Sequence, residues 1–260
     1  MSQARNAIVT GSTSGIGLGI AHALAAEGYN ILFNGFGDKA QIEAVVAETA
    51  KKYHVKTAYS DADMSKPEAI AGMVALAEKT FGSVDVLVNN AGIQYTARIE
   101  EFPAEKWESI LAINLSAAFY AMKAALPGMQ QRNYGRIINI ASAHGLVASA
   151  NKSAYVAAKH GIIGLTKVAA LENAPANITV NAICPGWVHT PLVQKQIEDR
   201  AAAKGCTAEK AQEELLSEKE PSKRFTTAAE IGGMVVFLCS DTAQNITGSH
   251  FSNDGGWTAQ

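Results

Sequence analysis

Cysteine is scarce in this sequence, which contains only Cys184, Cys206 and Cys239 among its 260 residues. Their odd number and scattered positions give no spacing of the kind that binds zinc. We therefore expect no metal site, and we interpret the three thiols as buried or inert groups in a reducing compartment.

An excess of charge of one sign is also missing. The formal net charge is -2 and no basic block occurs, which argues against nucleic acid as a main partner. The longest apolar stretches are too short and too interrupted to span a bilayer, so we expect no membrane partner. A strand is predicted from Asn6 onward, and no apolar signal-peptide core precedes it. These features favour a cytoplasmic protein.

Hydrophobic residues, by contrast, make up 48% of the chain, which is ample for the core of a single domain over 1–260. Short apolar strands alternate with helices, a pattern typical of a parallel sheet with helices on both faces. We therefore predict an α/β fold with a doubly wound parallel sheet of about seven strands. The predicted strands are 6–10, 30–34, 55–60, 84–89, 137–141, 177–184 and 249–253.

Helices are predicted over 39–53, 67–81, 104–131 and 228–240, with another beginning near Ser153. The segment 190–224 is charged, helical and longer than a simple connection. Excursions of this length from a compact domain are often functional, so we predict a helical substrate lid there.

A glycine-rich turn follows the first strand and opens a predicted helix that runs to about Glu27. It contains Gly11, Gly15 and Gly17 in the spacing G-x-x-x-G-x-G. Glycine allows a sharp turn and a close approach to a ligand, and the helix N-terminus offers free N–H groups to a pyrophosphate. The turn therefore predicts a dinucleotide site.

The end of the second strand indicates which dinucleotide is bound. An acid there would bind a ribose 2′-hydroxyl, and an arginine would accept a 2′-phosphate. The chain has neither, because Asn34 is followed by Gly35, Phe36 and Gly37, and Asp38 lies further along. The missing basic residue favours NAD. Phe36 either packs beside the adenosine or fills core.

Tyr155 and Lys159 are four residues apart on a predicted helix, so their side chains lie on one face. A free tyrosine has a pKa of about 10, and a neighbouring ammonium group lowers it. Ser142, at the carboxyl end of the preceding strand, can hydrogen-bond a substrate oxygen at the same point. These groups can move a proton on an alcohol or a carbonyl. Alone, a Tyr–Lys pair at this spacing is usually an ordinary surface face.

Three other segments accompany this set: the glycine-rich turn, Asn89-Asn90-Ala91-Gly92 at a strand end, and Pro185-Gly186. Together these residues resemble the short-chain dehydrogenase/reductase family over 7–257. The resemblance implies a Rossmann-type fold, a homotetramer and four catalytic residues, Asn114, Ser142, Tyr155 and Lys159. It also implies that a carbonyl of Asn114 holds a water that links Lys159 to solvent.

The resemblance also places residues along the cofactor. Ser14 stands where NADP-dependent members often carry a basic residue, which again favours NAD. Asp63 is expected to bond the adenine amino group, although it could equally cap the helix that follows. The expected cofactor-binding residues are Gly11, Thr13, Gly15, Ile16, Gly17, Phe36, Asp63, Asn90, Gly92, Tyr155, Lys159, Pro185, Gly186, Val188 and Thr190.

Further polar residues indicate the substrate. One cation with several hydrogen-bond donors around a catalytic tyrosine suits a small carboxylate. Taken singly, each has an ordinary alternative: a solvated lysine, a histidine that caps a loop, or tryptophans in the core. The expected substrate-binding residues are Gln94, Ser142, His144, Lys152, Tyr155, Trp187, Gln196 and Trp257.

This combination resembles one branch of the family, the bacterial D-3-hydroxybutyrate dehydrogenases, over 139–155, 181–188, 214–219 and 255–257. That resemblance implies NAD-dependent, reversible oxidation of D-3-hydroxybutyrate to acetoacetate, with Tyr155 as general base. Two alternatives stay open. One is a 3-oxoacyl thioester reductase that uses NADPH, and the other is a non-catalytic NAD-binding sensor.

Overall fold

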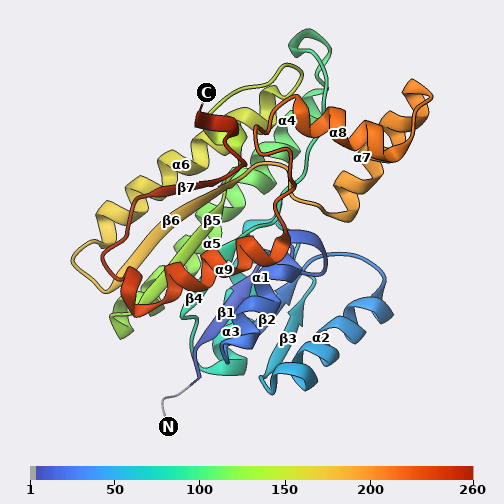
Figure 1. Cartoon of the computed structure of the whole chain (residues 1–260). Helices are drawn as coiled ribbons and strands as arrows, with labels where there is room; N and C mark the ends of the chain where they lie inside the picture. The colour runs from blue at the N-terminus through green and yellow to red at the C-terminus, as the bar shows by residue number, and fades with distance from the viewer. Residues whose placement is uncertain (1–3, 260) are drawn as a thin grey trace.

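The computed structural model describes residues 4–259 and contains a seven-stranded sheet in which all neighbouring strands are parallel (Figure 1). The strand order is β3-β2-β1-β4-β5-β6-β7. The strands are β1 Asn6–Val9, β2 Asn30–Asn34, β3 Thr57–Ser60, β4 Val86–Asn89, β5 Gly135–Ile140, β6 Ile178–Pro185 and β7 His250–Asn253. The predicted doubly wound sheet is confirmed.

The central strands are buried along their whole length. Every residue of β1, β2, β4, β5 and β6 is buried, which explains why these strands read as continuous apolar runs rather than as alternating patterns. Both faces of the sheet must therefore be covered by helices.

Two helical layers cover the sheet. One consists of α1 Gly15–Ala26, α2 Lys39–Tyr53 and α9 Ala228–Cys239, and the other of α3 Pro67–Phe81, α5 Ala117–Arg132 and α6 Ser153–Asn173. Each layer encloses its own apolar cluster against the sheet. Figure 1 shows α1 and α9 side by side on one face. Short 3₁₀ turns lie at Ile99–Glu101, Ala143–Gly145, Asp241–Ala243 and Trp257–Ala259.

The strand order reverses between β1 and β4. In open parallel sheets, ligands bind outside the carboxyl ends of the strands at such a point. The glycine-rich turn follows β1, and Asn89-Asn90-Ala91-Gly92 closes β4. The topology therefore brings these two predicted ligand-binding segments together.

The helix predicted over 104–131 is divided. It consists of α4 Ala104–Leu111, a π-helical segment Ala112–Ser116 and α5. Asn114 lies in the π-helical segment, as is common where a helix carries a functional residue. By length and composition the whole run, Ala104–Arg132, could cross a membrane, so the prediction that every apolar stretch is too short to do so is wrong for this run. Its buried side chains, such as Ala121 and Met122, pack into the core beneath the sheet, so it is a core helix of this fold.

The predicted lid region forms α7 Pro191–Lys204 and α8 Ala208–Ser217, hereafter the α7–α8 segment. The two helices enclose a small apolar cluster that includes Ile197 and Leu215. Arg200 of α7 binds Glu214 and Glu218. Figure 1 shows this segment, in orange, extending beyond the carboxyl ends of the strands.

All three cysteines are free, and Cys184 and Cys239 are buried. Cys206 is half-buried.

Candidate active site

The glycine-rich turn leaves space that no larger residue could leave. Gly11 has φ +61°, in the left-handed region that favours glycine. A Cβ on Gly17 would lie 2.2 Å from the carbonyl oxygen of Gly11. Ser14 precedes α1 without a side-chain capping bond, so the first-turn N–H groups stay available to an anion. This geometry fits a pyrophosphate.

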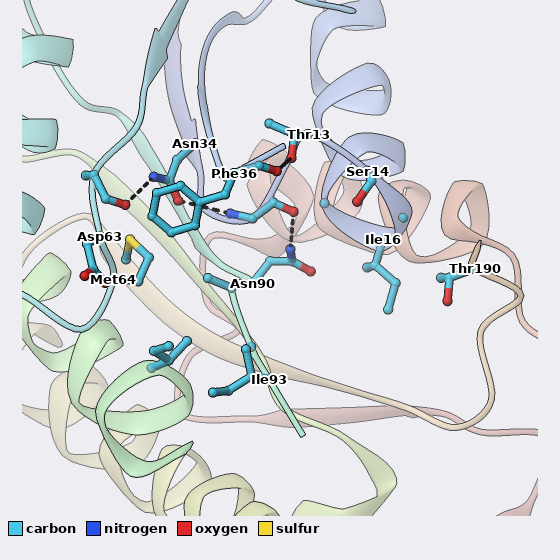
Figure 2. Close-up of a pocket in the computed structure, with 18 of the residues that line it drawn as sticks. Thr13, Ser14, Ile16, Asn34, Phe36, Asp63, Met64, Asn90, Ile93 and Thr190 are labelled. Atoms are coloured by element: carbon cyan, nitrogen blue, oxygen red, sulfur yellow. Dashed lines mark hydrogen bonds between the residues drawn. The ribbon is translucent and has the colours of Figure 1, made fainter. Parts of the chain in front are cut away.

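A pocket of about 400 Å³ opens beside this turn and carries the predicted adenosine-side residues (Figure 2). No arginine or lysine is among the described residues that line it. The predicted cofactor residues in its wall are Gly11, Thr13, Gly15, Ile16, Gly17, Phe36, Asp63, Asn90, Gly92 and Thr190.

Three side chains after β2 have distinct positions. The side chain of Asn34 hydrogen-bonds to the backbone: its Nδ2 donates to the carbonyl of Ala62 over 3.0 Å, and its Oδ1 accepts from the N–H of Gly11. Asp38 caps α2 by accepting from the N–H of Gln41, so its carboxylate serves that helix. Phe36 is 66% exposed, so the alternative that it fills core is wrong. Figure 2 shows its ring lying beside Asn34 in the pocket.

Asp63 lies across the same pocket, below Asn34 in Figure 2. Its Oδ1 accepts from the N–H of Ser65 over 2.8 Å. This backbone hydrogen bond lowers the pKa of Asp63. This bond closes a local turn. The alternative that Asp63 caps the helix that follows is wrong, because the N-cap of α3 is Lys66 and no side chain caps it. The position of Asp63 in the pocket wall is consistent with the expected contact to adenine.

Asn90 joins the two strand ends. Its Nδ2 donates to the carbonyls of Thr10 and Gly11 over 2.8 and 3.0 Å. Asn89 instead bonds Asn139 of the neighbouring strand over 2.8 Å, which ties β4 to β5. Asn90 therefore holds the glycine-rich turn against β4.

The predicted nicotinamide-side residues lie further along the sheet edge. Tyr155, Lys159, Pro185 and Gly186 line a second pocket together with Ile16, Asn90 and Gly92 of the first. Thr190 caps α7 through Val193, and its methyl group faces Gly15 across the crevice. Val188 is buried beside Thr226. One continuous surface therefore carries every predicted cofactor residue.

Ser142, Tyr155 and Lys159 meet at the end of β5. All three line the second pocket, and the hydroxyl of Ser142 accepts from the backbone N–H of His144 over 3.2 Å. Lys159 is only 4% exposed, and its Nζ donates to the carbonyl of Ile140 over 2.7 Å. That Nζ lies 5.6 Å from the centre of the Tyr155 ring.

Burial governs the charges of these groups. It raises the pKa of Tyr155, an effect that the neighbouring hydroxyl of Ser142 opposes. Burial also lowers the pKa of Lys159 to about 8. The expectation that Lys159 lowers the pKa of Tyr155 is therefore not met here. The physical reason is that a buried site disfavours the charged form of both groups.

Asn114 is anchored to the loop after β4. Its Oδ1 accepts from the N–H of Ile93 over 2.8 Å, and its Nδ2 donates to the carbonyl of Ile93 over 2.7 Å. A cavity of about 10 Å³ lies between Asn114 and Lys159. This volume is close to the minimum that one water needs, roughly 10–15 Å³. The geometry allows one water between the two residues.

The predicted substrate residues all line one pocket of about 160 Å³, hereafter the inner chamber. Trp187 and Trp257 stack in its wall with ring centres 6.4 Å apart. The members of the predicted set in this wall are Gln94, Ser142, His144, Lys152, Tyr155, Trp187, Gln196 and Trp257. Gln196 comes from α7, so the α7–α8 segment forms part of the chamber.

His144 and Lys152 share this chamber under strong burial. Burial, followed by the charges of Lys152, Lys219 and His160, lowers the pKa of His144 to about 4. Its Nε2 lies 3.0 Å from the hydroxyl of Ser149. Burial and then Lys219 lower the pKa of Lys152. The imidazole of His144 is therefore neutral near pH 7, and it lines the inner chamber together with the amino group of Lys152, a combination that suits an anion once that group is charged.

Comparison with known proteins bears on this geometry. Residues 11–258 match a family model described as enoyl-(acyl carrier protein) reductase. The D-beta-hydroxybutyrate dehydrogenase of Cupriavidus necator is 56% identical over 260 residues, with 100% of both chains covered. That of Rhizobium meliloti is 52% identical over 98% of this chain and 99% of its own.

A solved structure agrees with these relatives. It is the L-sorbose reductase of Gluconobacter frateurii complexed with NADPH and L-sorbose, which aligns with a TM-score of 0.95. The two chains share 31% identity over 99% of this chain and 98% of the other. The chain belongs to the short-chain dehydrogenase/reductase family. It is therefore an oxidoreductase that uses a nicotinamide cofactor, and the glycine cradle described above fits one.

Sequence reasoning missed several residues of this family member's site. Met64 and Ile93 line the cofactor pocket, and Lys219 and Ser149 line the substrate region. Their positions depend on loops that meet only in the folded chain. The one available signal was proximity, because Ile93 directly precedes Gln94. Among residues 4–259, no group of three His, Cys, Asp or Glu side chains gathers as metal ligands.

Proposed function

We propose that this protein catalyses the reversible, NAD-dependent oxidation of D-3-hydroxybutyrate to acetoacetate. The observation that carries the proposal is the inner chamber. It joins a proton-transfer pair, Ser142 and Tyr155, to an anion-binding group, Lys152, in about 160 Å³. The names and the high identity of the two hydroxybutyrate dehydrogenases support the same reaction.

The substrate carboxylate binds to Lys152, His144, Gln94 and Gln196. Lys152 supplies the charge, and the neutral imidazole and the amides supply hydrogen bonds. This orientation directs the hydroxyl group of the substrate toward Tyr155. Trp187 and Trp257 form the apolar wall and limit the length of the acid that fits.

Tyr155 then accepts the hydroxyl proton as a phenolate. Ser142 stabilises the developing carbonyl oxygen by a hydrogen bond, a type of contribution that preorganised donors make efficiently in buried sites. A nicotinamide cofactor held in this site would supply the acceptor for the hydride of the substrate carbon. Lys159 would hold the ribose of a bound cofactor.

The proton leaves Tyr155 through Lys159 and one water beside Asn114. Both polar atoms of the Asn114 side chain are committed to Ile93, so the main-chain carbonyl of Asn114 is the group that holds this water. The cavity of about 10 Å³ supports such a single-water path.

NAD rather than NADP is the proposed cofactor. A 2′-phosphate needs a cation, and no lysine or arginine is among the described residues of the adenosine-side pocket. Phe36, rather than an acidic residue, would contact the adenosine at the end of β2. Phe36 and Asp63 would hold the adenosine, and Val188 and Thr190 would hold the carboxamide.

We also propose that the single domain works with the α7–α8 segment as a substrate lid, which excludes water on closure. The quaternary state is proposed to be a homotetramer, and the compartment the cytoplasm. Exposed apolar side chains on α5 and α6, including Phe119 and Leu171, support an assembly of copies, and free cysteines suit a reducing compartment.

The experiment is a spectrophotometric assay at the NADH absorbance band. The purified protein is given NAD with each enantiomer of 3-hydroxybutyrate, and in parallel NADP, or NADPH with an acetoacetyl thioester. Fast reduction of NAD by the D enantiomer alone supports the proposal. Turnover of only the thioester with NADPH would instead identify a 3-oxoacyl reductase, and NAD binding without any turnover would identify a sensor.

A further inference from the structure

The inner chamber opens into a larger pocket of about 760 Å³, hereafter the outer chamber. Gln94, His144, Lys152 and Gln196 line both chambers. Ser142 and Tyr155 line only the inner one, where the chemistry takes place. A four-carbon acid is much smaller than the outer chamber, so this space serves a purpose other than holding the reacting molecule.

Lys219 lines only the outer chamber. It follows α8 directly, and its Nζ lies 5.8 Å from the ring centre of Trp257. The Nζ of Lys152 lies 5.5 Å from the ring centre of Trp187, which stacks on Trp257. Two lysine side chains therefore lie beside one pair of stacked tryptophans, which is a favourable place for cations.

Neither lysine is neutralised by the described residues. The ion pairs found among residues 4–259 include neither Lys152 nor Lys219. The one carboxylate in the outer wall is Glu218, which accepts from Arg200. Arg200 also reaches Glu214. The outer chamber therefore carries an uncompensated positive charge.

The charge of Lys219 acts on two other groups of the substrate site. The charge of Lys219 contributes, after burial, to the lowered pKa values of both Lys152 and His144. His160 adds a smaller effect on His144. Like charges that share a desolvated space repel, and an anion between them relieves the repulsion. The site is thus arranged for a carboxylate that both ammonium groups can approach.

We propose that Lys219 is a second anion-binding residue of the substrate site, which captures the carboxylate of the incoming hydroxy acid in the outer chamber before Lys152 holds it in the inner one. This inference rests on the proposed function. Gln196 lies within α7 and Lys219 follows α8, so one bound anion would contact both helices' parts of the α7–α8 segment.

The first test compares Lys219→Gln with Lys223→Gln in oxidation of D-3-hydroxybutyrate at increasing ionic strength. Lys223 is exposed, lies four residues away and lines neither chamber. Lys223→Gln therefore removes the same charge as Lys219→Gln but at a position outside the site. Removal of Lys219 is expected to raise KM about tenfold and to flatten the salt dependence of kcat/KM, because steering charges act mainly on association. The value of kcat is expected to stay within about twofold, because the inner chamber is intact.

The second test needs no turnover. Acetate is titrated into the NAD-saturated protein while tryptophan emission is followed, since Trp187 and Trp257 line both chambers. Weaker acetate binding in Lys219→Gln, with normal binding in Lys223→Gln, supports the inference. It is overturned if both variants match the wild type in acetate affinity and salt dependence. If the wild type leaves 3-hydroxybutyrate unchanged, the proposed function fails and the acetate titration alone decides on Lys219.

Discussion

Glu220 offers a direct test of how burial controls a charge beside the active site. Its side chain is 1% exposed, and its Oε1 accepts the backbone N–H of Trp187. Its Oε2 has no hydrogen-bond partner among the described residues. Burial, together with the nearby charge of Asp254, raises the pKa of Glu220 from 4.5 to about 7. The backbone bond from Trp187 and the charge of Arg224 oppose this rise.

The raised pKa has a defined effect on stability. Between 4.5 and about 7 the folded protein keeps a proton that the unfolded chain releases, so the free energy of unfolding falls as pH rises through this window. The separation of the two pKa values corresponds to about 3 kcal/mol at full extent. The loss is complete above about pH 7, where both states are ionised.

The change Glu220→Gln keeps the acceptor for Trp187 and removes the ionisation. We expect the variant to be more stable than the wild type by about 2–3 kcal/mol near pH 8. Near pH 5 the two proteins should differ by less than about 1 kcal/mol. The measurement is denaturant unfolding followed by fluorescence at both pH values, with the exposed Glu213→Gln of α8 as a matched control. An equal difference at both pH values would refute the reasoning.

Three further predictions concern the site. Tyr155→Phe is expected to lower kcat by about 10²–10⁴-fold, the usual contribution of a positioned acid–base group, while NAD titration by fluorescence shows unchanged binding. Near-wild-type turnover would refute that assignment. Lys152→Ala should raise KM for 3-hydroxybutyrate about 10- to 100-fold, since hydrogen bonds to charged groups contribute about 1.5–3 kcal/mol; a normal KM would move the carboxylate elsewhere. Gly17→Ala should abolish NAD binding in calorimetry, because its Cβ would lie 2.2 Å from the Gly11 carbonyl, and retained affinity would contradict the cradle.

The fold and the set of reacting groups could be predicted from the amino-acid sequence. Helices α2 and α3 begin and end where the pattern predicts them, at Lys39–Tyr53 and Pro67–Phe81, because their apolar periodicity and the glycine after α3 are local signals. The spacing of Tyr155 and Lys159 is likewise local, since one helical turn relates them. The sheet could be predicted because short, continuous apolar runs are typical of parallel strands that are buried on both faces.

Only the tertiary structure decided the details that depend on distant parts of the chain. The π-helical segment at Asn114 pairs with Ile93, 21 residues away, and no local pattern specifies such a bond. Asp38 was free in the sequence to serve the cofactor, but the start of α2 uses it as a cap. The pKa of Tyr155 is raised because burial, which sequence spacing does not express, outweighs the neighbouring hydroxyl of Ser142.

Lys219 and Glu220 show the same limit most clearly. In the sequence they are two charged residues at the end of a polar helix, and a solvated face is the natural interpretation. In the structure, Lys219 faces the outer chamber and Glu220 is buried against Trp187. Their roles arise because the chain that follows α8 packs against the residues that follow β6 and β7. The burial and the charge environment of a side chain depend on which distant segments pack against it, so they cannot be predicted from the local sequence.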